Sequence, residues 1–183
     1  MNIFKKWQDR DTSPKNRVLA LLIGALVFPV LIPILFFVFS PGMDRALGFP
    51  SFSSGWGNIL AGALLTILGG GVAMWSIVTQ IELASGTPFP MLPTKKLLIA
   101  GPFKYCRNPM TLGTVLAYGG IAVGIGSYSA LLSVAVIAAI LIGYLKLIEE
   151  KELQLRFGEE YLAYTKNTPF MIPISIKKKD ADR

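Results

Sequence analysis

The sequence predicts an all-α, polytopic membrane protein of about four transmembrane helices, the last two forming a helical hairpin. Three observations lead to this fold class. The 183 residues are 52% hydrophobic and their mean hydropathy is +0.54, which is typical of chains that lie in a bilayer. Four long apolar segments carry almost no charge, and the basic residues gather between and outside them. We therefore expect residues 1–183 to form a single integral membrane domain.

The four predicted transmembrane segments differ in length and spacing. They comprise residues 17–39, 58–81, 111–126 and 129–148. The first two carry no charge after Arg17 and exceed the roughly 20 residues that a helix needs to cross a bilayer. Only Ser127 and Tyr128 separate the last two, so these are expected to form the hairpin.

The distribution of basic residues predicts the topology. Five Lys or Arg lie in residues 1–17, one in 40–57, four in 82–110 and eight in 146–183, with none in the hairpin turn. By the positive-inside rule, both termini and the central loop are cytoplasmic, which agrees with an even number of spans. Residues 1–16 then form a cytoplasmic tail. Because topology accounts for the net charge of +7, we expect no nucleic-acid partner.

Residue counts exclude several kinds of chemistry. The chain has no His and a single cysteine, Cys106. Ser-His and Cys-His catalysis are therefore excluded, and no metal site is expected. The lone thiol has no internal disulfide partner and is interpreted as inert. The first apolar segment is too long for a cleavable signal peptide and follows a charged tail, so we expect it to be retained.

The connecting segments contain few helical signals. Residues 40–57 are rich in Ser, Gly, Pro and Phe and are predicted to form an external loop, and residues 82–100 contain enough Gly and Pro to predict a cytoplasmic loop. Pro29 and Pro33 are expected to kink the first helix unless neighbouring helices satisfy the freed carbonyl groups.

Glycines predict that two of the apolar segments pack closely. Gly69, Gly70 and Gly71 follow no predicted strand, so they do not form a phosphate-binding loop. Gly120 and Gly124 make a small-xxx-small pattern. Both groups are interpreted as points where helix backbones approach one another.

The stretch Leu97 to Gly113, LLIAGPFKYCRNPMTLG, concentrates the chemical signals. Asn108 precedes Pro109, which predicts an N-cap followed by a first helical residue. Unpaired N–H groups at such a helix start, with basic residues just upstream, suit an anionic group of a ligand. Those basic residues are Lys95, Lys96, Lys104 and Arg107. The alternative is an ordinary helix start whose basic residues only fix topology.

A second candidate segment follows the last apolar run. Residues 146–157, KLIEEKELQLRF, contain good helix formers, and Gly158 is the predicted stop. Glu149 lies where the apolar run ends, and a carboxylate at that depth is costly unless it is paired, which indicates a functional residue. The alternative is a solvated helix end with a Lys146–Glu150 pair at i,i+4 spacing.

Two separated stretches resemble one family. GPFKYCRNPMTLG at Gly101 to Gly113 is followed by EEKELQLRFGEEYLAYTKNTPFMIP at Glu149 to Pro173. Together they resemble the isoprenylcysteine carboxyl methyltransferase family and its phospholipid methyltransferase relatives. The family pattern is approximately GPY-x3-RHP-x-Y-x-G, then two Glu and FG-x2-Y-x2-Y. With RNP in place of RHP, the chain looks like a bacterial or archaeal-type member.

The resemblance implies that S-adenosylmethionine binds at the cytoplasmic ends of the last helices, within residues 82–110 and 149–183. Carried over by position, the cofactor-binding residues are Lys95, Lys96, Leu97, Leu98, Phe103, Arg107, Asn108, Pro109, Met110, Thr111, Glu149 and Glu150. A helix N-terminus or a Lys can hold the methionine carboxylate. Glu149 can take the ammonium group or a ribose hydroxyl, and Phe103 can pack on adenine.

Two departures from the family pattern leave the methyl acceptor open. Asn108 replaces the family His and Thr111 replaces the family Tyr, so contacts made through imidazole or phenol do not transfer. Methyl transfer from a sulfonium is an in-line displacement that demands alignment, so the absence of a His base does not prevent it. No catalytic residue is assigned.

The resemblance therefore implies a methyltransferase acting on an apolar or membrane-embedded acceptor, such as an isoprenylcysteine-like carboxylate, a thiol or a lipid, that enters sideways from the bilayer. A phosphatidylethanolamine-type lipid amine N-methyltransferase is one alternative. From another class, the alternative is a non-enzymatic membrane scaffold or transporter subunit. We expect a prokaryotic cytoplasmic membrane protein with lipids as partners, in which residues 86–100 and 161–173, including Tyr161 and Tyr164, close over adenosine.

Overall fold

The computed structural model describes residues 18–19, 22–24, 26–52, 55–84 and 97–173. Every regular element in this part of the chain is helical, which confirms the all-α class. The elements are the π-helix η1 (Val27–Leu31), α3 (Ile32–Leu47), α4 (Trp56–Ala84), the 3-10 helix η2 (Gly101–Lys104), α5 (Pro109–Ile125), α6 (Tyr128–Tyr144), the π-helix η3 (Leu145–Glu149) and α7 (Glu150–Asn167).

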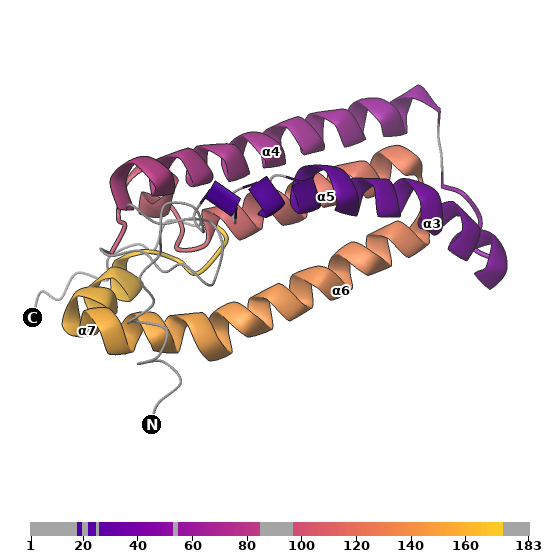
Figure 1. Ribbon diagram of the computed structural model, residues 1–183. Coiled ribbons are helices and arrows are strands. Elements are labelled where there is room, and N and C mark those ends of the chain that lie inside the picture. Colours follow the sequence, from indigo (N-terminus) through magenta and orange to yellow (C-terminus); the bar gives the residue numbers. More distant parts are fainter. Residues whose placement is uncertain (1–17, 20–21, 25, 53–54, 85–96, 174–183) are drawn as a thin grey trace, which may run out of the picture.

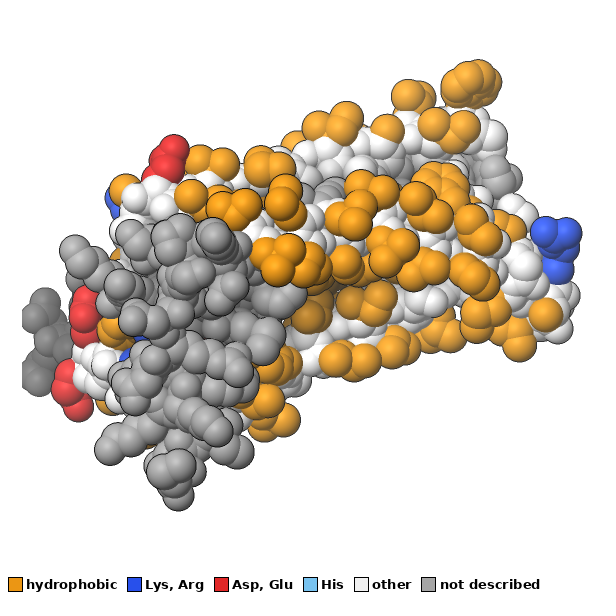
Figure 2. Space-filling view, viewed as in Figure 1, with side chains coloured by type: hydrophobic (Ala, Val, Ile, Leu, Met, Phe, Trp, Pro, Cys, Tyr) orange, Lys and Arg blue, Asp and Glu red, His pale blue; other side chains and the backbone are white. Residues whose placement is uncertain are grey.

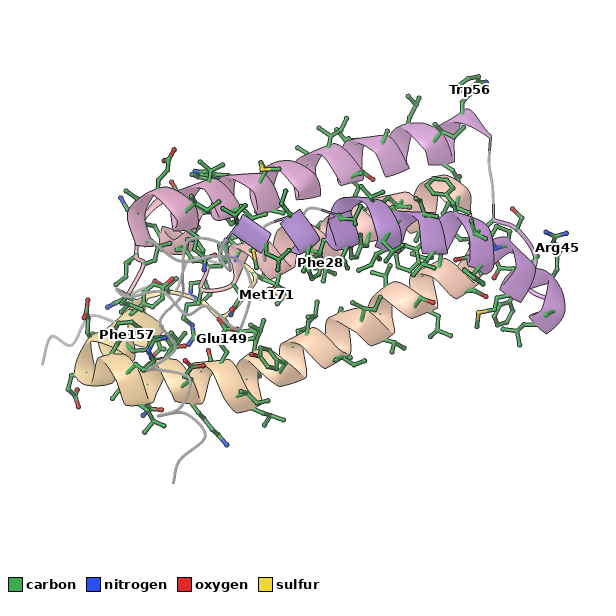
Figure 3. The ribbon with its side chains drawn as sticks, in the orientation of Figure 1. Phe28, Arg45, Trp56, Glu149, Phe157 and Met171 are labelled. Carbon is green, nitrogen blue, oxygen red and sulfur yellow. The ribbon has the colours of Figure 1, made fainter. Side chains whose placement is uncertain are left out.

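Helices α4 and α5 lie side by side and antiparallel, and they form the most extensive contact between elements (Figure 1). α6 returns along the bundle and continues through η3 into α7, at the end where α4 finishes and α5 begins. Arg45 and Trp56 mark the opposite end from Glu149, Phe157 and Met171 (Figure 3). Residues from both sequence motifs therefore gather at one end of the molecule.

Glycines allow the close approach of α4 and α5. A Cβ atom at Gly69 would lie 2.4 Å from the Ala117 backbone nitrogen, and one at Gly113 would lie 2.5 Å from that of Ala73. Neither position has room for a side chain. Gly70 and Gly71 face open space instead, so the predicted packing role holds only for the first glycine of that run.

The long helices are apolar on the outside. α4 over Trp56–Leu83 and the α6–η3–α7 segment over Tyr128–Asn167 are long and apolar enough to cross a membrane, whereas α5 is a shorter apolar helix. Hydrophobic side chains cover the middle of the visible face, and described charged side chains appear near its two ends (Figure 2). The helical stretch before the kink at Gly158, residues 128–157, is about 45 Å long, which exceeds the hydrocarbon thickness of roughly 30 Å, so only part of it can cross. Four spans remain a prediction.

The first predicted loop begins later than expected. Residues 40–47 belong to α3, so the prediction of a loop from residue 40 is wrong. Pro41 is tolerated inside the helix, and Arg45 Nε donates a hydrogen bond to the Pro41 carbonyl oxygen at 3.2 Å. The extra turns place Asp44 beside α6, where its carboxylate accepts a hydrogen bond from the Ser129 backbone N–H at 2.8 Å. A carboxylate at a helix N-terminus is favourable.

The proline region of the first helix is held by α5. The first helix contains a π-helical turn, η1, in which each carbonyl oxygen accepts from the N–H five residues later. The partner of the Phe28 carbonyl oxygen would be Pro33, which has no N–H to donate. Tyr118 OH on α5 donates a hydrogen bond to that oxygen at 2.8 Å. A neighbouring helix therefore satisfies a freed carbonyl group, which is the exception that the sequence left open to a kink in this helix. The Tyr118 ring also packs edge-on against Phe36, with ring centroids 5.7 Å apart.

Candidate functional site

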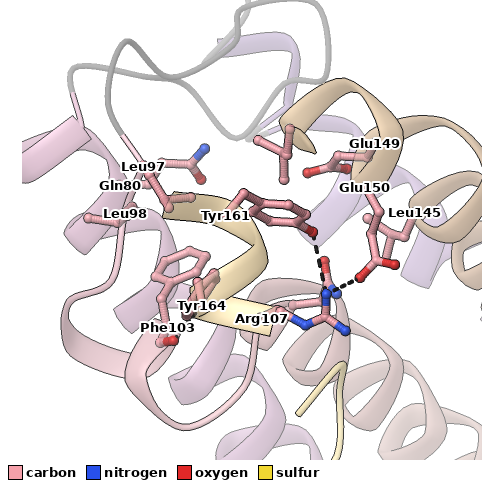
Figure 4. A pocket seen from close by; sticks show the side chains of 12 residues that line it. Gln80, Leu97, Leu98, Phe103, Arg107, Leu145, Glu149, Glu150, Tyr161 and Tyr164 are labelled. Atoms are coloured by element: carbon pink, nitrogen blue, oxygen red, sulfur yellow. Dashed lines mark hydrogen bonds and ion pairs between the residues drawn. The ribbon is translucent and has the colours of Figure 1, made fainter. Parts of the chain in front are cut away.

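A cavity lies where the end of α4, the start of α5 and the α6–α7 junction meet (Figure 4). Its volume is about 80 Å³. It is lined by Gln80, Leu97, Leu98, Phe103, Arg107, Asn108, Leu145, Glu149, Glu150, Leu153, Tyr161 and Tyr164. Both stretches that carry the family resemblance line this cavity. The first contributes Phe103, Arg107 and Asn108, the second contributes five residues from Glu149 to Tyr164, and α4 contributes Gln80.

Gly101 sets the position of the turn that carries Phe103. Its φ of +54° is a left-handed conformation that side chains rarely adopt, and a Cβ atom there would lie 2.8 Å from Thr79 Oγ1 on α4. Glycine is therefore required both by the backbone and by the space. The resulting contact holds η2 directly against α4 and brings Phe103 to the cavity.

Arg107 is the centre of the polar contacts at this site. Its Nη1 atom lies 2.5 Å from Glu150 Oε1, which joins the residue before the α5 N-cap to the first turn of α7. The same nitrogen lies 3.5 Å from the Tyr161 hydroxyl. Arg107 Nε is buried and has no hydrogen-bond partner among the described residues. A buried donor without a partner is costly, and a ligand acceptor would relieve that cost.

The segment Thr168–Pro173, called here the C-terminal strap, packs against the start of α5. The Arg107 backbone N–H donates to the Pro169 carbonyl oxygen, and Asn108 Nδ2 donates to the Phe170 carbonyl oxygen, both at 2.9 Å. The Phe170 ring is near two cations, with its centroid 5.7 Å from Arg107 Cζ and 5.0 Å from Lys146 Nζ. Glu150 pairs with Arg107, and no Lys146–Glu150 pair is among the described ion pairs.

Asn108 is the N-cap residue of α5 by position and Pro109 its first residue, as predicted. The Asn108 side chain, however, makes no capping hydrogen bond to the helix, so the prediction of a side-chain cap is wrong. The reason is that its amide is committed to the strap. The Asn108 carbonyl oxygen accepts the first helical hydrogen bond from the Leu112 N–H.

Glu149 lies one residue beyond the predicted apolar segment, at the end of η3. Burial raises the pKa of its carboxyl group from 4.5 to about 7, and the neighbouring Glu152 and Glu150 add to this rise. A cation placed beside Glu149 would reverse the effect and favour the carboxylate. Burial likewise raises the pKa of the Cys106 thiol, which disfavours the reactive thiolate.

Two tyrosines of α7 join the motifs on the other side of the cavity. Tyr164 OH donates to the Phe103 carbonyl oxygen at 2.5 Å, and the Tyr161 and Tyr164 rings pack with centroids 6.3 Å apart. Both residues lie beyond Gly158, where α7 is kinked by a non-helical backbone (φ 52°, ψ −125°). Gly158 therefore ends the first helical stretch of α7, as predicted, and a second stretch begins beyond it and carries the two tyrosines to the cavity.

The structure brings together seven of the twelve residues that the resemblance implies. These are Leu97, Leu98, Phe103, Arg107, Asn108, Glu149 and Glu150. Pro109, Met110 and Thr111 occupy the first turn of α5 and do not line the cavity, while Lys95 and Lys96 lie outside the described residues. Within the described part of the chain, no group of three His, Cys, Asp or Glu residues is placed to hold a metal ion.

Gln80, Leu145 and Leu153 line the cavity without having been expected there. Leu145 and Leu153 lie one turn before and one turn after Glu149, so helical spacing from that residue was an available signal. The sequence signal for Gln80 was weaker: it is an amide near the end of an otherwise apolar segment.

Comparison with known proteins agrees with this geometry. The model of the phospholipid methyltransferase family matches residues 58–160, which run from α4 into α7 and include all the cavity-lining residues except Tyr161 and Tyr164. No curated protein matches the sequence significantly. Because the family match covers more than half of the chain and contains the RNP segment, the Glu149–Glu150 pair and the helices that bring them together, the chain belongs to the phospholipid methyltransferase family.

Proposed function

We propose that this protein is a membrane-integral methyltransferase that uses S-adenosylmethionine, that the cavity is its cofactor site, and that its acceptor is apolar or membrane-embedded. Membership of the family supports methyl transfer. The observation that carries the cofactor assignment is the meeting of Phe103 and Glu149 at one cavity, from stretches separated by the α5–α6 hairpin.

The donor set fits the chemical groups of this cofactor. S-adenosylmethionine supplies an electrophilic methyl group on a sulfonium, beside an amino acid and an adenosine. Glu149 is a carboxylate suited to the ammonium group or a ribose hydroxyl, and Arg107 Nε is a buried donor suited to a carboxylate. Phe103 offers an aromatic face for a base. The chain's part in the reaction is to hold and align the reacting atoms while water is excluded.

The cavity must widen to admit such a cofactor. A volume of about 80 Å³ is below the roughly 300–1,000 Å³ of small-molecule pockets. Two walls can separate most readily at the kink of Gly158, beyond which the Tyr161–Tyr164 pair and the C-terminal strap are held by a few hydrogen bonds. This proposal keeps the lid role for residues 161–173; residues 86–96 lie outside the described part of the chain.

The acceptor is proposed to arrive from the bilayer, because the helices that lead to the site are apolar on their outer surfaces. The family name favours a lipid amine as the more specific candidate, as in a phosphatidylethanolamine-type N-methyltransferase. An isoprenylcysteine-like carboxylate or a thiol is the other enzymatic candidate. We further propose cytoplasmic termini in a prokaryotic cytoplasmic membrane, from the distribution of basic residues.

Calorimetry of the detergent-purified protein with S-adenosylhomocysteine tests the cofactor assignment. Saturable binding that weakens in Glu149→Gln is expected, and an absence of binding heat would favour the scaffold alternative. The acceptor is then sought with methyl-tritiated S-adenosylmethionine and lipid extracts, prenylated thiols or small apolar thiols. Label that appears only on a water-soluble polar acceptor would contradict entry from the bilayer.

A further inference from the structure

The cavity has two chemically different halves (Figure 4). One half is charged and holds Arg107, Glu149 and Glu150. The other half is largely apolar: Leu97, Leu98 and Phe103 form it with Tyr164, whose hydroxyl is hydrogen-bonded to the Phe103 carbonyl oxygen, and Gln80 adds an amide. A ligand that fills both halves therefore needs a charged end and a flat or apolar end with a polar edge.

Gln80 belongs to the apolar half because α4 is fixed against η2 there. Its neighbour Thr79 is buried and donates a hydrogen bond to the Trp75 carbonyl oxygen at 2.8 Å, and it is Thr79 that packs against Gly101. This contact fixes the α4 backbone at Gln80 relative to Phe103. Gln80 is the one α4 residue in the cavity lining.

We infer that Gln80 recognises the edge of the adenine base of S-adenosylmethionine, while Phe103 and the two leucines contact the ring. This inference rests on the proposed function. A glutamine amide presents a donor and an acceptor side by side, which is the complement of the adenine 6-amino group and an adjacent ring nitrogen. The apolar walls suit the faces of a base, and they are poorly suited to the charged amino-acid part, which the opposite half accommodates.

Removing the Gln80 amide from the protein, or the 6-amino group from the ligand, tests the proposed contact. The affinities of S-adenosylhomocysteine and of its analogue lacking the 6-amino group are measured by calorimetry for the wild type and for Gln80→Met, which keeps the side-chain length. The wild type is expected to bind the adenine compound about tenfold more tightly, the range of one good amide–base pair. Gln80→Met should lose this preference or reverse it, because the 6-amino group then has no partner to offset its desolvation, whereas the analogue has no such group to desolvate.

Gln80→Glu provides a second variant of the same length, which can accept from the 6-amino group but cannot donate to a ring nitrogen. It should lose affinity for S-adenosylhomocysteine and keep part of the preference for the 6-amino group. Thermal unfolding of each variant verifies that the fold persists. Equal binding of both compounds by the wild type, or an unchanged preference in Gln80→Met, would overturn the inference and leave the proposed function standing. If the wild type bound neither compound, the proposed function itself would fail.

Discussion

Arg107 Nη1 and Glu150 Oε1 lie 2.5 Å apart, and this ion pair joins the two sequence stretches that carry the family resemblance. Arg107 precedes the N-cap of α5, and Glu150 begins α7, so the pair spans the whole α5–α6 hairpin. The Arg107 and Glu150 side chains are only 13% and 27% exposed. Partial burial makes the loss of one partner costly, because the remaining charge stays desolvated.

Glu150→Gln is therefore expected to lower the free energy of unfolding. The buried-pair range is about 3–5 kcal/mol, and partial exposure reduces our expectation to about 1–3 kcal/mol. Thermal unfolding in detergent measures the change, with Lys151→Gln as the control because Lys151 is exposed on the same helix. Equal melting temperatures for the two variants would show that the ion pair contributes nothing to stability.

Glu149→Gln is expected to have the opposite effect on stability, and only at higher pH. The pKa of Glu149 is about 7 in the folded protein and 4.5 without these shifts, so between these values the folded state holds a proton that the unfolded chain has lost. Stability therefore falls as pH rises through this window and stays lower above it. The variant removes the buried charge and should be more stable than wild type by at least about 1 kcal/mol at pH 8, with little difference at pH 4.

The measurement is a series of melting temperatures from pH 4 to pH 8 in the absence of cofactor. Glu159→Gln, at an exposed site on α7, is the matched control and should follow the wild-type curve. A Glu149→Gln curve parallel to that of the wild type would mean that the Glu149 carboxyl group is not penalised by burial. A residue that reduces stability at neutral pH is expected to be kept for function, which is why the same variant is used for cofactor binding.

Local sequence signals predicted the parts of the site that are local in structure. Asn108 and Pro109 mark the start of α5, and Glu149 stands at the end of the apolar run, as expected. The partners of these residues depend on contacts between distant elements. Glu150 lies one i,i+4 step from Lys146, yet it pairs with Arg107 from another element, and the Asn108 amide bonds to the strap instead of capping its own helix.

The same limit explains the residues that sequence reasoning missed. Gln80 reaches the cavity because Gly101 lets η2 approach α4, and nothing in the apolar segment around Gln80 encodes that contact. The extension of α3 to Leu47 contains Pro41 and Gly42, which locally favour a loop. Its Asp44 bonds to the α6 N-terminus, a contact that is stabilising only in the packed bundle.

Gly69→Ala is expected to destabilise the bundle strongly, whereas Gly70→Ala is not. A Cβ atom at Gly69 would lie 2.4 Å from a backbone nitrogen of α5, so α4 and α5 would have to move apart, whereas one at Gly70 meets nothing within 4 Å. Overpacking of this kind costs about 1–3 kcal/mol, and more where rigid backbone blocks relaxation. The two adjacent variants have identical composition, so their difference in melting temperature isolates the helix contact. Similar stability for both would show that the helices are not in close contact at Gly69.

The kink in α7 leads to the last prediction, which separates a conformational role of glycine from a packing role. Gly158 has φ 52° and ψ −125°, a combination that is unfavourable for any residue with a Cβ atom, and its surroundings are open. Gly158→Ala should therefore lower stability by about 1–3 kcal/mol through backbone strain and not through a clash. Gly143→Ala is the matched control, because Gly143 is also in open surroundings but lies within regular helix.

At position 143 alanine is expected to be neutral or stabilising by up to about 1 kcal/mol. At position 158 the second half of α7 should straighten or turn, which would carry Tyr161 and Tyr164 away from Arg107 and the Phe103 carbonyl oxygen. Affinity for S-adenosylhomocysteine should then fall more in Gly158→Ala than in Gly143→Ala, measured in parallel with thermal unfolding. If Gly158→Ala kept wild-type affinity while losing stability, the two tyrosines would not be part of the cofactor site. Only the placement of these tyrosines depends on the kink, because the other cavity-lining residues precede Gly158.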